Sequence, residues 1–91
     1  MCIEFSMDDY VGNWIQSNTN GKTAMLLCNR SEYTLTCELK NTVHTFAINR
    51  QNRRKLTNQA NEKIKGIYQN NGTIIWHKGP KFFATWVKPG T

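Results

Sequence analysis

The chain has few of the features that mark a large or specialised protein. It has 91 residues, two prolines, six acidic residues and no long apolar run. A chain of this length forms one domain, residues 1–91, because its core is near the lower limit for unaided folding. No run approaches the length of a membrane-spanning helix, and the start, MCIEFSMDDY, lacks the regions of a signal peptide. We therefore expect a soluble, cytoplasmic protein.

Cysteine is scarce and odd in number, and its three positions are Cys2, Cys28 and Cys37. An odd count does not indicate a disulfide framework. A hairpin turn within residues 29–32 would place Cys28 opposite a residue near Tyr33, so Cys28 and Cys37 would be out of register for a bridge. We expect free thiols and a reducing compartment. The glycosylation sequons at Asn29 and Asn71 point the other way, and in a chain so rich in asparagine we interpret them as chance.

Clusters of catalytic or metal-binding residues are also lacking. His44 and His77 are isolated, and the cysteines do not have the C-x-x-C spacing of a metal site. Asp8 and Asp9 are adjacent at an expected helix start, where capping explains them, and there is no glycine-rich phosphate loop. We expect no metal, no cofactor and no enzymatic activity.

Acidic residues are nearly absent from one segment of the chain. Residues 1–39 carry two basic and five acidic side chains, a net charge of −3, whereas residues 40–91 carry ten basic side chains and the single acidic Glu62, a net charge of +9. This asymmetry indicates attraction to a polyanion, namely nucleic acid, an anionic membrane surface or an acidic protein. The alternative is that the lysines serve solubility.

What the sequence does contain is alternation of apolar and polar residues. The run YTLTCELK, residues 33–40, alternates clearly, and the runs at 23–28 and 42–49 also have strand character. Ser6-Met7-Asp8-Asp9 has the spacing of a capping motif that would begin one helical turn. The fold we predict is mainly β, a small antiparallel β-barrel or curved sheet of six to seven strands with one short helix.

The short helix is expected between Asn52 and Gly66. Asn52 can cap it, Leu56, Ala60 and Ile64 recur at every fourth position, and Gly66 would end it. The competing interpretation of this segment is a long basic hairpin loop.

The last residues predict a three-stranded meander with two apolar faces. A two-residue turn at Asn71-Gly72 would pair Ile67 with Trp76, and a turn at Gly79-Pro80 would pair Trp76 with Phe83. One face would then be core, and it would hold Tyr68, Ile75, Phe82, Ala84 and Trp86. The other face would place Ile67, Trp76 and Phe83 beside Lys65, Lys78 and Lys81. Either this second face is an exposed aromatic platform next to a lysine row, or its rings pack under the predicted helix as core.

The stretch FSMDDYVGNWIQ, residues 5–16, with Gly12-Asn13-Trp14 at its centre, resembles the opening of lipocalins and related calycins. The resemblance implies a short helical turn leading into the first barrel strand, with Trp14 plugging one end of the barrel and a late basic residue, Lys88, packed on it. Barrels of that family with a ligand cavity are well over a hundred residues long, so here we expect a small barrel filled by its own side chains.

From these observations we predict that the protein is a non-catalytic binding module for a polyanion. The ligand that we favour is RNA or single-stranded DNA. Aromatic rings would stack on bases while cations contact phosphates. The residues assigned to this site are Lys65, Lys78, Lys81, Trp76, Phe83, Arg53, Arg54 and Lys55. The first alternative is a protein-interaction module or inhibitor, including one that self-associates through its unlike halves. The second is a binder of carbohydrate or another small ligand.

Overall fold

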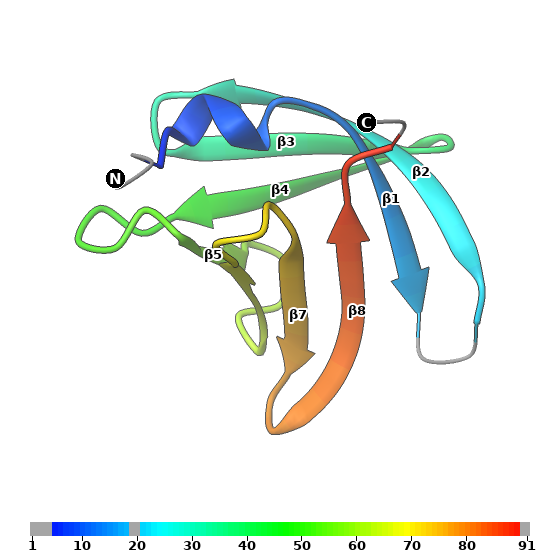
Figure 1. Ribbon diagram of the computed structural model, residues 1–91. Coiled ribbons are helices and arrows are strands. Elements are labelled where there is room, and N and C mark those ends of the chain that lie inside the picture. The colour runs from blue at the N-terminus through cyan, green and yellow to red at the C-terminus, as the bar shows by residue number, and fades with distance from the viewer. Residues whose placement is uncertain (1–4, 19–20, 90–91) are drawn as a thin grey trace.

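Most of the alternating runs form strands of one closed antiparallel barrel, in which each strand pairs with its neighbours in sequence and the last strand pairs with the first (Figure 1). The computed structural model describes residues 5–18 and 21–89. Its elements are η1 (Met7–Tyr10), β1 (Gly12–Asn18), β2 (Thr23–Ser31), β3 (Thr34–Leu39), β4 (Thr42–Ile48), β5 (Lys55–Asn58), β6 (Ile64–Tyr68), β7 (Ile74–Lys78) and β8 (Lys81–Val87). The predicted mainly β class is confirmed, but the barrel has eight strands rather than six or seven.

The single helical turn predicted before the first strand is confirmed. Ser6 caps η1, because its hydroxyl accepts a hydrogen bond from the Asp8 backbone N–H while the Asp9 carboxylate accepts one from the Ser6 N–H. This reciprocal pair satisfies backbone donors that a helix start leaves unpaired. The turn directs Tyr10 into the core and delivers the chain to β1.

The predicted helix at 52–64 is wrong, and this segment forms β5 and β6 instead. The asparagine side chains account for the difference, since an Asn carboxamide can bond the backbone two or three residues on and so stabilise a turn. Asn49, Asn52, Asn58 and Asn61 each accept such bonds, over 2.8 to 3.3 Å. Turns therefore flank β5 on both sides, and Leu56 lies inside the barrel opposite Gly66.

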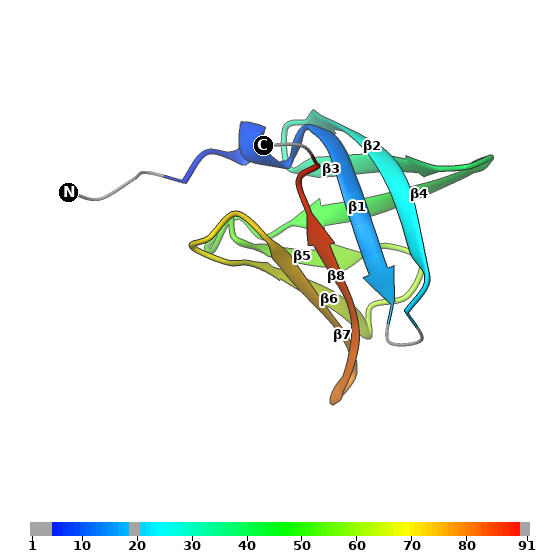
Figure 2. The same cartoon turned by 45° about the vertical axis from the view of Figure 1, so that its right-hand side comes forward.

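The largest side chains of the interior are aromatic. Trp14, Trp76 and Trp86 are all buried, and Phe46 packs with its ring centroid 4.8 Å from that of Trp76 and 5.6 Å from that of Trp86. An eight-stranded barrel has an interior just wide enough for side chains to fill. Figure 2 shows the strands curving around this interior, with β5, β6 and β7 side by side in one wall.

The predicted β6–β7 register is wrong by one residue. Gly66, not Ile67, is opposite Trp76, because the turn has three residues instead of two. The Gly72 N–H donates to the Gln69 carbonyl at 3.1 Å, and Gly72 has a φ of 84°, the arrangement of a type I turn followed by a left-handed glycine. A slip of one residue exchanges the two faces of a strand, so Ile75 lies on the outer side with Ile67, and Trp76 faces inward.

The predicted β7–β8 register is correct at the turn and wrong beyond it. Lys78 pairs with Lys81 as predicted, but a bulge between Trp76 and His77 shifts the ladder, so Trp76 pairs with Ala84 rather than Phe83. A bulge inserts one extra residue on one strand. Ala84 and Trp86 are buried, as predicted, whereas Phe82 is exposed.

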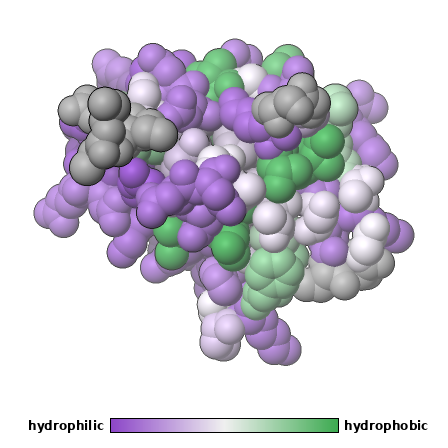
Figure 3. All heavy atoms as spheres, viewed as in Figure 1, coloured by the Kyte–Doolittle hydropathy of each residue, from purple (hydrophilic) through white to green (hydrophobic). Residues whose placement is uncertain are grey.

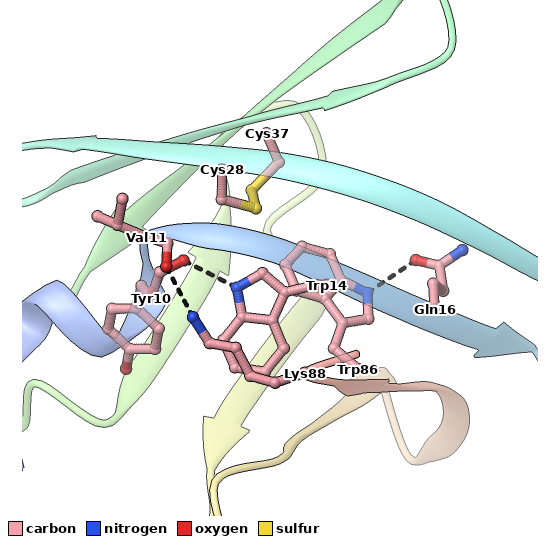
Figure 4. Close-up of a disulfide and its surroundings, with 8 residues drawn as sticks. All are labelled: Tyr10, Val11, Trp14, Gln16, Cys28, Cys37, Trp86 and Lys88. Atoms are coloured by element: carbon pink, nitrogen blue, oxygen red, sulfur yellow. Dashed lines mark hydrogen bonds between the residues drawn. A yellow bond between two sulfur atoms is a disulfide. The ribbon is translucent and has the colours of Figure 1, made fainter. Parts of the chain in front are cut away.

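The prediction of free thiols is wrong for two of the three cysteines. Cys28 and Cys37 are directly opposite each other on β2 and β3, with 4.1 Å between their Cα atoms, and form a disulfide (Figure 4). The hairpin turns later than predicted, because Ser31 pairs with Thr34. Cys2 lies outside the described residues. Disulfides are typical of oxidising compartments, so the cytoplasmic location stays a prediction that has lost this support.

Candidate functional site

One end of the barrel is sealed by residues around η1. The Trp14 indole donates to the Tyr10 carbonyl at 2.8 Å, and the Lys88 ammonium lies 4.7 Å from the centroid of the Trp14 ring (Figure 4). Lys88 also donates to the Val11 carbonyl at 2.7 Å, so it ties the end of β8 to the start of β1. Cation–π contact and a charge-assisted hydrogen bond stabilise the same closure.

Burial at this sealed end shifts two pKa values in opposite directions. Burial raises the pKa of Tyr10, and the Tyr10 hydroxyl donates to the Arg53 carbonyl at 2.5 Å. Burial lowers the pKa of Lys88, because the charged ammonium loses solvation beside the indole. Both shifts follow from withdrawal of the charged form from water.

The opposite end of the barrel holds a cavity of about 210 Å³. It reaches from the middle of the barrel toward the end remote from η1, where Leu39 ends β3, His44 lies early in β4 and Phe83 lies early in β8. Its lining consists of Gln16, Leu26, Leu39, His44, Phe46, Asn58, Ile64, Trp76, Phe83 and Trp86. The expected barrel filled by its own side chains is therefore correct for the sealed end but not for this one.

The polar groups in the cavity are few, and one of them has no partner. The Trp86 indole donates to the Gln16 side-chain oxygen at 2.8 Å, and the Asn58 side-chain oxygen accepts backbone bonds from Ala60 and Asn61. Within residues 5–18 and 21–89, Trp76 Nε1 is the buried side-chain polar atom that has no hydrogen bond. An indole N–H can only donate, and leaving a buried donor unpaired costs about 1–3 kcal/mol.

The two rings of the predicted platform are not together on an exposed face. Trp76 is 1% exposed, so it cannot stack on a base from outside, and this assignment is wrong. The three-residue turn and the bulge described above turn its side chain inward. Phe83 is 37% exposed and lies at the cavity with Trp76. Both rings therefore belong to the interior site.

The structure does not gather the six predicted cations in one place. Lys55 and Lys65 are exposed on neighbouring strands, and Lys78 and Lys81 are exposed at the β7–β8 turn. Arg53 is exposed in the β4–β5 connection. Arg54 is at the sealed end, where it lies 5.1 Å from the Phe5 ring centroid and donates to Asn70.

The interior site uses residues that the sequence analysis did not assign to a site. Gln16, His44, Asn58 and Ile64 line it. Gln16 had a detectable signal, since it follows Trp14 by two residues and therefore shares its face of the strand. Asn58 and Ile64 had no comparable signal, because the spacing of apolar residues in their segment indicated a helix and not a strand.

Chemical groups for catalysis are not gathered in the part of the chain that the structure describes. That part contains no cluster of three or more His, Cys, Asp or Glu residues able to hold a metal ion. His44 lines the cavity, whereas His77 is outside it.

None of the described helices has the length and apolar character needed to cross a membrane. The absence of enzymatic activity stays a prediction, as does a protein partner or self-association.

These features define a small, closed, eight-stranded antiparallel β-barrel with one sealed end and one end that opens into an apolar cavity. No family model, curated protein or solved structure matches the chain. Its function is therefore argued from its own residues.

Proposed function

We propose that the protein binds a small, flat, mainly apolar ligand in the open end of the barrel, and that an acceptor atom of this ligand bonds Trp76 Nε1. The observation that carries the proposal is this buried indole donor, which has no partner among the described residues and belongs to a side chain that lines the cavity. Buried polar groups in native proteins are nearly always bonded, and an exception calls for an explanation. A ligand carbonyl or heteroaromatic nitrogen supplies one.

The size of the cavity limits the ligand. An apolar protein cavity of about 150 Å³ takes up benzene, and pockets for drug-sized molecules begin at about 300 Å³. The volume of about 210 Å³ therefore suits one aromatic ring with short substituents. Phe46, Trp76 and Trp86 offer ring faces and edges for packing.

The lining favours such a ligand over a carbohydrate. A sugar presents several hydroxyl groups, and each one buried without a partner carries a desolvation cost. Trp86 Nε1 and the Asn58 oxygen are already engaged within the protein. The carbohydrate alternative consequently has less support than a ligand with a single acceptor.

We also propose that the resemblance to lipocalins extends to the sealed end. Support comes from Trp14 at the start of β1, from the preceding turn η1, and from Lys88 packed on the indole. Membership of that family is not needed for the ligand proposal, which depends on the other end of the barrel.

The test compares two ligands that differ only in having a carbonyl oxygen or a methylene group at the same position. Acetophenone and α-methylstyrene have nearly the same shape, but only acetophenone has a carbonyl acceptor. We expect acetophenone to bind about 2- to 12-fold more tightly, the equivalent of one net hydrogen bond of about 0.5–1.5 kcal/mol. Isothermal titration calorimetry measures both affinities.

Two variants sharpen the comparison. Trp76→Phe removes the donor and should abolish the preference for acetophenone, whereas Phe82→Leu, on the outer surface, should leave it unchanged. Equal affinities for the two compounds in the native protein, or no binding of either, would contradict the proposal.

A further inference from the structure

The outer face of β5, β6 and β7 combines lysines with exposed apolar and planar side chains. One cross-strand row runs from Thr57 through Lys65 and His77 to Phe82. The next row places Lys55 beside Ile67. Phe82 is 47% exposed and Ile67 is 42% exposed, so both apolar side chains are accessible to a partner beside these lysines. Figure 3 shows apolar groups set among polar ones on the molecular surface.

This face is hollowed rather than flat. A shallow groove of about 510 Å³ is lined by Glu62, Lys63, Lys65, Ile67, His77 and Gly79. A second hollow of about 230 Å³ lies next to it and shares Lys65 and Ile67. The Gly79 N–H donates to the Lys63 carbonyl at 2.9 Å and holds the two turns at the end of the groove together. We define the basic groove as five exposed residues, Lys55, Lys63, Lys65, Ile67 and Phe82, together with the half-buried His77.

Among the described residues, the lysines of the basic groove have no acidic partner within ion-pair distance. Within the described ranges, Arg30–Asp8 is the ion pair, and it joins β2 to η1. Glu62 is the one carboxylate in the lining of the groove. Exposed cations without counter-charges attract a polyanion and accelerate its association.

We propose that the basic groove binds single-stranded nucleic acid. The rings of His77 and Phe82 lie 6.2 Å apart between centroids, beside Lys65, so planar groups and cations occur together. Bases stack on such rings while ammonium groups contact phosphates. A membrane surface would suit a protruding apolar edge better than a hollowed face, and an acidic peptide would leave the exposed rings unexplained.

This site differs from the one that the sequence predicted. Lys55 and Lys65 are retained, Phe82 replaces Trp76 and Phe83 as the stacking ring, and Lys78 and Lys81 flank the groove at the β7–β8 turn. None of the residues lining its two hollows lines the interior cavity, so the two sites are separate.

The experiment measures fluorescence anisotropy of a labelled oligouridylate of about 12 nucleotides over a range of salt concentrations. Affinity should fall steeply with salt, and Lys65→Gln should reduce the slope of log K against log salt by about 0.7. Lys40→Gln is the matched control, because Lys40 lies at the β3–β4 turn, away from β5–β7 (Figure 1), and should leave the slope unchanged.

Ring stacking is tested in the same assay. Phe82→Ala should weaken binding about 5- to 150-fold, which corresponds to one stacked base at about 1–3 kcal/mol. Val43→Ala, an exposed apolar residue on β4, should have no effect. Glu62→Gln should strengthen binding, because it removes the carboxylate from the groove.

Several results would overturn the proposal. They are affinity that does not change with salt, equal losses in Lys65→Gln and Lys40→Gln, and binding of polyglutamate as tight as that of the oligonucleotide. Binding to phosphatidylserine vesicles without binding to the oligonucleotide would assign the groove to a membrane instead. Near-UV circular dichroism of each variant verifies that the barrel is folded.

Discussion

Trp76 packs against a residue that has no side chain. A Cβ added at Gly66 would lie 2.8 Å from three carbons of the Trp76 indole, closer than real contacts allow. The Gly66 backbone therefore forms the surface on which the ring rests, and a glycine within a strand often marks such a close approach. The orientation of Trp76, and with it the direction of its Nε1–H donor, depends on this contact.

Gly66→Ala should destabilise the barrel. The added methyl group would clash with the indole that rests on this backbone, and overpacking of this kind typically costs about 1–3 kcal/mol. Urea unfolding followed by tryptophan fluorescence measures the free energy of unfolding. A variant as stable as the native protein would mean that the indole does not lie on Gly66.

Tyr10 links the stability of the sealed end to alkaline pH. Because burial raises its pKa above the ordinary value of 10, the folded state keeps the phenol proton where the unfolded state loses it. The folded state then binds more protons above pH 10, so the free energy of unfolding falls as pH rises beyond that value.

Tyr10→Phe should reduce this alkaline loss. At pH 8 the variant should be less stable than the native protein, because it lacks the bond to the Arg53 carbonyl. Above pH 10 the two stability curves should converge, as measured by denaturant unfolding at several pH values. Curves that stay parallel from pH 8 to pH 11 would contradict this role.

Among the elements, those with clear alternation were predicted correctly, whereas the segment with asparagine-stabilised turns was not. The alternation in 33–40 and 42–49 was sufficient to predict β3 and β4. The fourfold spacing of Leu56, Ala60 and Ile64 was misleading, because asparagine side chains stabilise turns at Asn58 and Asn61 in the middle of that pattern. Periodicity does not report which turn a side chain can form.

The unknown length of the turns also limited the prediction of which side chains face the cavity. The Asn71-Gly72 pair correctly indicated a hairpin, but two-residue and three-residue turns both use glycine there and differ in register by one residue. Neither the bulge beside Trp76 nor the later turn before Thr34 has a sequence signal that alternation detects. The prediction was therefore right about lysines on the strands and wrong about which rings face water.

The disulfide should contribute measurably to the stability of the β2–β3 hairpin. It joins residues nine positions apart, and closing a loop of that size corresponds to about 2–3 kcal/mol in the chain-entropy model. Dithiothreitol should lower the free energy of unfolding by about this amount, measured by denaturant titration with and without the reductant. Alkylation of the unfolded, unreduced protein should modify one of the three cysteines. Modification of all three would contradict the pairing.

At the scale of the whole molecule, closure separates an apolar interior from a charged exterior. The interior offers one unpaired donor in an apolar cavity, and the exterior offers a groove with cations and rings. These surfaces suit ligands of different chemistry, and they differ in their response to salt. Affinity for the interior ligand should be insensitive to salt, whereas affinity for a polyanion should not be.

The indole N–H of Trp76 reports most directly on the central claim that the cavity binds a ligand through this donor. In a ¹H–¹⁵N spectrum the three tryptophans give three side-chain signals, and Trp76→Phe assigns one of them. Titration with acetophenone should move the Trp76 proton signal further downfield than titration with α-methylstyrene, because both compounds bring a ring current to the cavity but only the ketone accepts a hydrogen bond. A Trp76 signal that acetophenone leaves unmoved, or that both compounds move alike, would contradict the claim.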